Sequence, residues 1–184
     1  MRFVASEIQG VFVLELEPHR DERGEFARVW AEDELAAHGL TAELSQCSIS
    51  RNVRAGTLRG MHFQHAPHAE AKLVRCTRGA IFDVALDLRP DSPTHGKWFG
   101  TELTAENGAA LFIPEGCAHG FQTLVDDSEV LYFISAPYAP DAAGGVRWDD
   151  PAFGIEWPPC GERILNERDR DYPDYSGSLR SRGT

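Results

Sequence analysis

The stretch GTLRGMHFQHAPHAEAKLVRCTRGAIFDVALD, residues 56–87, contains the strongest structural pattern in the chain. Residues 80–88 alternate with the period of two that is typical of a β-strand. One face of this segment is apolar and carries Phe82, Val84, Leu86 and Leu88. The other face carries two acids, Asp83 and Asp87. Because a buried carboxylate without a partner is costly, both acids are expected to be paired.

Residues 57–64 alternate in the same way. One face carries mostly small and polar side chains, namely Leu58, Gly60, His62 and Gln64. The other carries Thr57, Arg59, Met61 and Phe63. The pattern therefore predicts a second strand, on which His62 and Arg59 point to opposite sides.

Basic residues gather around these strands in a chain that is acidic overall. The formal net charge is -11, yet residues 51–78 hold six Lys and Arg side chains against one acid, Glu70. Three histidines, His62, His65 and His68, lie in the same window. A basic segment in an acidic protein favours a site for a small anion, because the surrounding field repels a polyanion. Solvated surface charge is the alternative interpretation.

Length and composition restrict the class of protein further. The 184 residues fit one domain over 1–184, in which 137–184 is expected to be a loop-rich C-terminal wrap. No apolar run approaches the roughly 18 residues of a membrane span and the N-terminus lacks a secretory pattern, so a cytoplasmic protein without a membrane partner is expected. The net charge of -11 argues against nucleic acid as a partner. The four Cys residues form no CxxC pair, which predicts reduced thiols.

The pattern along the whole chain is that of an all-β protein. Strand-like segments recur between turns rich in Gly, Pro and Asp. They are 10–17, 43–50, 57–64, 72–76, 80–88, 98–103, 109–113, 121–124 and 129–135. One short helix is expected in WAEDELAAHGL, residues 30–40, and a polar turn over 19–26.

A further motif covers residues 108–121. Its residues fit G-x5-P-x-G-x2-H, which resembles the second motif of the cupin superfamily. The first cupin motif needs His-x-His, whereas the spacing here is His62, His65 and His68, with Pro67 interrupting any strand. The resemblance implies a cupin double-stranded β-helix, a jelly-roll barrel with short peripheral helices, that lacks metal ligands.

Nine segments, in order, resemble one enzyme family. They are LRGMHFQ (58–64), AKLVR (71–75), FDVALDLR (82–89), DSPT (91–94), ELTAEN (102–107), IPEGCAHGF (113–121), VLY (130–132), VRWDDPAFGIEWP (146–158) and ILNERD (164–169). Over about 10–169 the chain is similar to the dTDP-4-dehydrorhamnose 3,5-epimerases. The resemblance implies a homodimer without metal or cofactor that inverts C3 and C5 of a dTDP-4-keto-6-deoxyhexose.

The chemistry of that family explains which residue types are needed. A C4 ketone acidifies the protons on C3 and C5. Inversion therefore needs a base and an acid on opposite sides of the ring, and a donor for the enolate oxygen. By resemblance, His62 is the base, Asp169 orients it, Tyr132 is the acid, and Lys72 contacts the enolate oxygen.

The resemblance also implies residues that bind the substrate. Arg59 is expected at the diphosphate, where a planar guanidinium fits best. His119 is expected close to Lys72 and paired with Asp83. Arg23 and Phe26 match residues that help to hold the nucleotide, often across the dimer interface. Two more positions that contact substrate in the family are Gln46 and Arg168.

Four positions depart from the family pattern. Arg28 stands where a Glu is usual, Gln46-Cys47-Ser48 replaces Gln-Asp-Asn, Ala143 replaces a Glu, and Arg168 replaces a Lys. These positions are among those that contact substrate in the family. Because Arg28 replaces a carboxylate and reverses its charge, it is expected to alter which nucleotide or sugar substituent is accepted. The alternatives are a 3- or 5-mono-epimerase, an epimerase of another nucleotide-linked keto-sugar, a metal-dependent cupin enzyme, and a cupin that only binds sugars.

Overall fold

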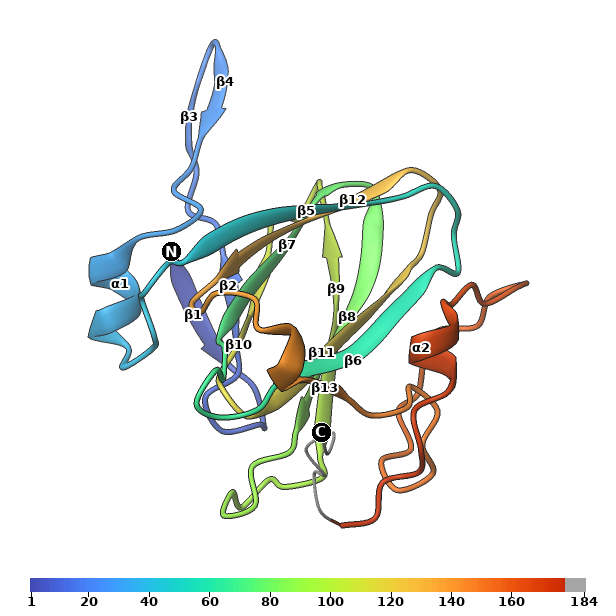
Figure 1. Ribbon diagram of the computed structural model, residues 1–184. Coiled ribbons are helices and arrows are strands. Elements are labelled where there is room, and N and C mark those ends of the chain that lie inside the picture. Colours follow the sequence, from blue (N-terminus) through green and yellow to red (C-terminus); the bar gives the residue numbers. More distant parts are fainter. Residues whose placement is uncertain (178–184) are drawn as a thin grey trace.

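The computed structural model describes residues 1–177, and most of its regular structure is antiparallel strand (Figure 1). The strands are β1 (Arg2–Ala5), β2 (Phe12–Glu15), β3 (His19–Asp21), β4 (Gly24–Phe26), β5 (Gln46–Asn52), β6 (Leu58–Gln64), β7 (Lys72–Arg78), β8 (Ala80–Asp87), β9 (Trp98–Thr104), β10 (Ala110–Ile113), β11 (Cys117–Thr123), β12 (Ser128–Ile134) and β13 (Ala143–Gly145). The helices are short: α1 (Glu32–Ala37), the 3-10 turn η1 (Pro140–Ala142) and α2 (Glu167–Arg170). None of the described helices is long and apolar enough to cross a membrane.

Two sheets form the barrel. The order in the six-stranded sheet is β1-β2-β10-β7-β12-β5, and in the five-stranded sheet it is β13-β6-β11-β8-β9. Strands that are distant in sequence are neighbours in both sheets, as in a jelly roll. The predicted all-β, cupin-like fold is confirmed.

Apolar side chains from both sheets fill the space between them. Val74, Leu111 and Val130 come from the six-stranded sheet, and Ala85 and Phe121 from the five-stranded sheet; each is at most 1% exposed. Full burial of a Val, Leu or Phe side chain contributes about 1.5–3 kcal/mol. This layer therefore holds the two sheets in a fixed relation, which in turn fixes the side chains they direct into the barrel.

The outer face of the five-stranded sheet is covered by the chain that follows β12. Phe153 and Val146 from this segment pack on Met61, Val84 and Leu86. The apolar face predicted for 80–88 is therefore directed outward, against this covering segment. The face with Asp83 and Asp87 points into the barrel, where both acids are fully buried.

Every expected strand is present, with ends that differ by a few residues. The largest difference is β11, which begins at Cys117 rather than at residue 121. Residues 19–26, expected as a polar turn, instead form a hairpin of β3 and β4 that extends away from the barrel (Figure 1). The side chains of the hairpin are exposed on both faces, so the sequence shows no alternation of apolar and polar residues there. Arg20 Nε pairs across the hairpin with Glu25 Oε2 at 3.0 Å.

Candidate active site

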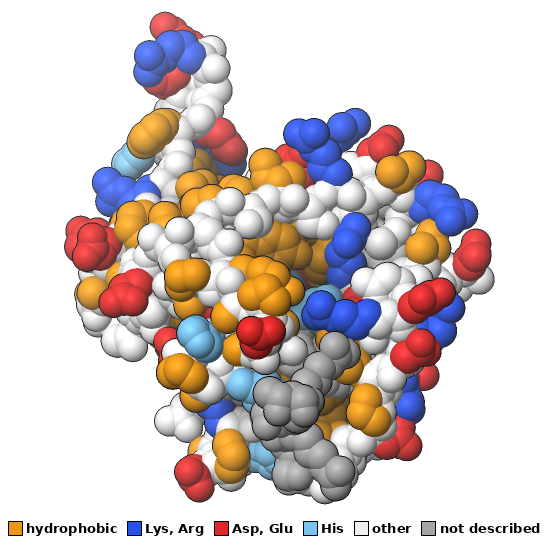
Figure 2. Space-filling view, in the orientation of Figure 1, with side chains coloured by type: hydrophobic (Ala, Val, Ile, Leu, Met, Phe, Trp, Pro, Cys, Tyr) orange, Lys and Arg blue, Asp and Glu red, His pale blue; other side chains and the backbone are white. Residues whose placement is uncertain are grey.

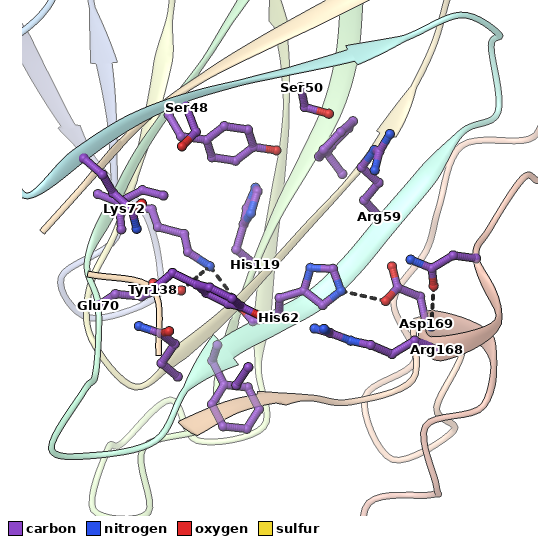
Figure 3. A pocket seen from close by; sticks show the side chains of 18 residues that line it. Ser48, Ser50, Arg59, His62, Glu70, Lys72, His119, Tyr138, Arg168 and Asp169 are labelled. Carbon is purple, nitrogen blue, oxygen red and sulfur yellow. Dashed lines mark hydrogen bonds and ion pairs between the residues drawn. The ribbon is translucent and has the colours of Figure 1, made fainter. Parts of the chain in front are cut away.

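A cavity of about 400 Å³ lies in the barrel and receives side chains from both sheets and from α2 (Figure 3). On the surface, Lys and Arg side chains border a hollow in which His atoms are visible (Figure 2). Nine of the thirteen predicted site residues line this cavity, and they are His62, Lys72, Tyr132, Asp169, Gln46, Ser48, Arg59, His119 and Arg168. The basic, His-bearing stretch thus contributes to a concave site rather than only to solvated surface.

His62 and Asp169 form a hydrogen-bonded pair on one side of the cavity. His62 Nε2 donates to Asp169 Oδ1 at 2.7 Å, and the Gly60 backbone N–H donates to Asp169 Oδ2 at 3.1 Å. Asn166, which precedes α2, accepts from the Asp169 backbone N–H at 2.7 Å. Both carboxylate oxygens of Asp169 are therefore engaged, and this side chain is only 1% exposed. His62 Nδ1 has no hydrogen-bond partner among the described residues, which leaves this nitrogen free to act as a base.

The protonation states suit that role. Burial lowers the pKa of His62 below its ordinary 6.5, and it outweighs the hydrogen bond and charge of Asp169, which raise the pKa. The charges of Lys72 and Arg168 lower it further. Burial alone would raise the pKa of Asp169, but the bond from His62 and the charge of that ring hold it below its ordinary value. At neutral pH the pair is therefore a neutral imidazole beside a carboxylate.

An irregularity in β6 corrects the predicted placement of Arg59. Strict alternation puts Arg59 and His62 on opposite faces, but both line the cavity. In the pairing of β6 with β11, His62 is opposite His119 whereas Arg59 is opposite Phe121, so β6 contains one extra residue between these pairs. Such a bulge shifts the side-chain alternation by one position.

A second His–Asp pair lies on the neighbouring strands. His119 Nε2 donates to Asp83 Oδ1 at 2.8 Å, as predicted, and both side chains are at most 5% exposed. Asp83 is behind His119 and does not line the cavity, so its predicted substrate contact is indirect. Burial raises the pKa of Asp83, an effect that the charge and hydrogen bond of His119 oppose. The pair fixes the orientation of the His119 ring.

Tyr132 packs edge-on against His119, with ring centroids 5.8 Å apart and planes at 77°. Burial raises the pKa of Tyr132 well above its ordinary value, the charge of Asp83 raises it further, and Arg59 lowers it. The phenol therefore keeps its proton at neutral pH. A side chain that serves as a general acid must hold its proton in this way until the reaction.

Each cation of the cavity is held by a neutral or acidic partner. Lys72 Nζ pairs with Glu70 Oε1 at 2.8 Å. Arg59 Nε donates to the amide oxygen of buried Asn52 at 2.8 Å. Arg168 Nε donates to the Tyr172 hydroxyl at 2.9 Å. These contacts leave the guanidinium ends of Arg59 and Arg168 available to an anion.

Several participants were not anticipated from sequence. Glu70 and Tyr138 line the cavity, Asn166 caps α2 there, and Asn52 holds Arg59. Glu70 is noticeable in the sequence as the single acid of the basic window, but no motif assigns it a role. An Asn three residues before a helical Asp is a capping signal, so Asn166 could have been found.

Besides Asp83, three predicted residues do not reach this cavity within one chain. Arg23 is on the β3–β4 hairpin and pairs with Asp21, while Phe26 on the same hairpin is 75% exposed. Arg28 pairs with Glu34 at the start of α1 at 3.0 Å. The charge of Arg28 is therefore directed to α1 and does not change the cavity of its own chain.

Among residues 1–177, no three His, Cys, Asp or Glu side chains come together as a group that could hold a metal ion. His65 and His68, which share the basic window with His62, do not line the cavity.

Comparison with known proteins places this site in a family. The model of the dTDP-4-dehydrorhamnose 3,5-epimerase family matches residues 5–176. The dTDP-4-dehydrorhamnose 3,5-epimerase of Sinorhizobium fredii is 44% identical over 173 residues, which cover 94% of this chain and 89% of that protein. The dTDP-4-dehydrorhamnose 3-epimerase of Streptomyces niveus is 40% identical over 93% of this chain and 82% of its own length.

Comparison with solved structures points to the same family. The crystal structure of the dTDP-4-dehydrorhamnose 3,5-epimerase from Elizabethkingia anophelis superimposes with a TM-score of 0.93 and 35% identity, and covers 98% of this chain and 99% of its own. Because the family model and these relatives extend over nearly the whole chain, and over every segment that builds the cavity, the chain belongs to the dTDP-4-dehydrorhamnose 3,5-epimerase family.

Proposed function

We propose that this protein inverts C3 and C5 of dTDP-4-keto-6-deoxyglucose, giving dTDP-4-dehydrorhamnose. The observation that carries the proposal is the convergence of a neutral His62–Asp169 pair, a protonated Tyr132 and the Lys72 ammonium on one cavity. These are a base, an acid and an electrophilic donor, which are the groups that epimerisation next to a ketone needs. Only protons are transferred, so the chemistry requires no metal or cofactor.

The proposed sequence starts with proton removal. His62 Nδ1 takes the proton from C3 or C5, and the electron pair moves toward the C4 oxygen to form an enolate. The carboxylate of Asp169 stabilises the resulting imidazolium. Lys72, with His119 nearby, stabilises the negative C4 oxygen. Tyr132 then donates a proton to the opposite face of the same carbon, which inverts it.

The diphosphate of the substrate is expected at the guanidinium groups. Arg59 and Arg168 present planar donors that suit phosphate oxygens. Gln46 and Ser48 lie along β5 and offer hydrogen bonds to the sugar. In this binding mode the nucleotide projects beyond the cavity of a single chain.

A homodimer is part of the proposal. The β3–β4 hairpin extends from the barrel and presents Phe26 at 75% exposure, and Ile49 on β5 is 56% exposed. Such apolar side chains suit an interface with a second copy. In that arrangement Arg23 and Phe26 would hold the nucleotide of the partner subunit. A cytoplasmic location remains a prediction.

A 3-mono-epimerase is the second candidate, because a relative at 40% identity carries that name. Incubation of the purified protein with dTDP-4-keto-6-deoxyglucose in heavy water, followed by NMR of the sugar, separates the candidates. Deuterium at both C3 and C5, lost in His62→Ala, is the expected result. Deuterium at one carbon would identify a mono-epimerase. Absence of exchange would contradict the proposal for this substrate and direct the search to another nucleotide sugar.

A further inference from the structure

Glu70 forms an ion pair with Lys72, the one Lys among the described residues that line the cavity. Its Oε1 atom is 2.8 Å from Lys72 Nζ, and both side chains are 9% exposed. Lys72 Nζ also donates to the backbone carbonyl of His62 at 3.4 Å, so the ammonium lies between Glu70 and the proposed base (Figure 3). The pair is therefore at the centre of the site rather than at its rim.

Among residues 1–177, Glu70 is the only direct counter-ion of Lys72. The other acid that lines the cavity, Asp169, is engaged by His62 and by the Gly60 N–H. Among the described residues, no other carboxylate is within ion-pair distance of Lys72 Nζ. Arg59 and Arg168 line the same cavity, so without Glu70 the ammonium would be nearly buried among like charges.

The backbone around Glu70 is well anchored. The next residue, Ala71, donates its N–H to Ser135 Oγ at 2.8 Å, and its carbonyl accepts from the Ser135 N–H at 3.0 Å. Lys72 then begins β7 and pairs with Ile113 and Ile134 on both sides. The carboxylate therefore extends from a fixed point, whereas Lys72 has a flexible four-carbon stem that needs a partner to hold its end in place.

We propose that Glu70 is a positioning residue of the epimerase: its carboxylate holds Lys72 Nζ where the enolate oxygen develops. This inference rests on the proposed function. A donor contributes to catalysis when it is already placed before charge develops, because no reorganisation is then needed during the reaction. Glu70 supplies this placement through Lys72 and takes no proton itself.

The test compares steady-state kinetics of Glu70→Gln, Lys72→Met and the double variant with dTDP-4-keto-6-deoxyglucose. Glu70→Gln keeps the shape of the side chain and removes its charge. It is expected to lower kcat about 10- to 100-fold, with KM changed less than about twofold, because the donor acts mainly in the transition state. The double variant is expected to match Lys72→Met within about twofold, since Glu70 acts only through Lys72.

Two further variants complete the design. Glu70→Asp keeps the charge at a shorter reach and should recover part of the lost kcat. Glu129→Gln is the matched control, because Glu129 also forms a 2.8 Å ion pair, with Arg51, but does not line the cavity. It is expected to keep wild-type kcat.

Wild-type kcat in Glu70→Gln, or losses that multiply in the double variant, would overturn the inference. An equal loss of kcat in Glu129→Gln would also overturn the inference. So would a kcat in Glu70→Asp no higher than in Glu70→Gln, provided that circular dichroism shows both Glu70 variants to be folded. Failure of the proposed function is a separate result, because the wild-type protein itself would then show deuterium at only one carbon or no deuterium exchange.

Discussion

Asp169 shows how one buried side chain can set the chemistry of its neighbour. Its two oxygens accept from His62 Nε2 and from the Gly60 N–H, so the carboxylate fixes the His62 ring and leaves Nδ1 without a partner among the described residues. In the proposed reaction, the same carboxylate would face the imidazolium that forms when His62 takes a proton. Orientation and charge stabilisation therefore come from one residue.

Asp169→Asn is expected to lower kcat by about 10²–10⁴-fold, because the amide can neither stabilise the imidazolium nor enforce the same tautomer. Steady-state kinetics would measure the loss, and KM should change much less. Arg170→Gln, at an exposed position on the same helix, is the control and should keep wild-type kcat. If Asp169→Asn retained wild-type kcat, the pair would be structural only.

The pH dependence follows from the state of His62. Burial places its pKa below 6.5, and only the neutral ring can accept a proton, so kcat/KM should fall as the pH drops through that lowered pKa. The acid limb of the profile is thus expected below pH 6.5. An acid limb above that value would contradict the assignment of a desolvated His62 as the base.

At the scale of the strand, β6 explains both what sequence can predict and what it cannot. The alternation in 57–64 and 80–88 correctly indicates strands, since a period of two depends only on local residue types. The direction of the Arg59 side chain could not be predicted, because the bulge arises where β6 pairs with β11, a strand distant in sequence, and where Gly60 closely approaches Gly120. The β3–β4 hairpin was missed because its residues contact no core.

Gly60 is the position where this strand geometry can be tested. A Cβ built on it would lie 2.5 Å from Gly120 Cα and 2.9 Å from the His119 carbonyl oxygen, and its φ of 136° is unfavourable for other residues. Gly60→Ala is expected to destabilise the fold by about 2–4 kcal/mol, since backbone on both sides must shift. Urea unfolding would measure this.

The control is Gly161→Ala. Gly161 has ordinary φ and no atom within 4 Å of a built Cβ, so its substitution should change stability by less than about 0.5 kcal/mol. Equal stability of Gly60→Ala and wild type would mean that the bulge does not need a glycine.

At the scale of the whole molecule, the two sheets and α2 bring nine of the thirteen residues named from sequence to one cavity. The sequence also named Arg23 and Phe26, which a single chain leaves outside the cavity. The resemblance implies that these two residues often act across a dimer interface, which the structure of one chain does not test. The separation of the β3–β4 hairpin from the barrel makes contribution to a partner subunit the arrangement to test (Figure 1).

Phe26→Ala is expected to raise KM about 5- to 30-fold with a smaller effect on kcat, because a nucleotide contact of about 1–2 kcal/mol is lost. Val53→Ala is the matched control, since Val53 is also 75% exposed but has no predicted contact with substrate. It should keep wild-type KM. The same KM in Phe26→Ala and Val53→Ala would argue against a role of the hairpin in binding the nucleotide.

Mixing two defective chains tests whether the hairpin acts on the partner. In a heterodimer of Arg23→Ala and His62→Ala chains, one cavity combines an intact His62 with an intact hairpin from the other chain. If the hairpin acts across the dimer, refolding the two variants together should restore up to about a quarter of wild-type activity, because half of the dimers are mixed and each has one intact site. If the hairpin acts within its own chain, no cavity is intact and the mixture stays as inactive as its parts.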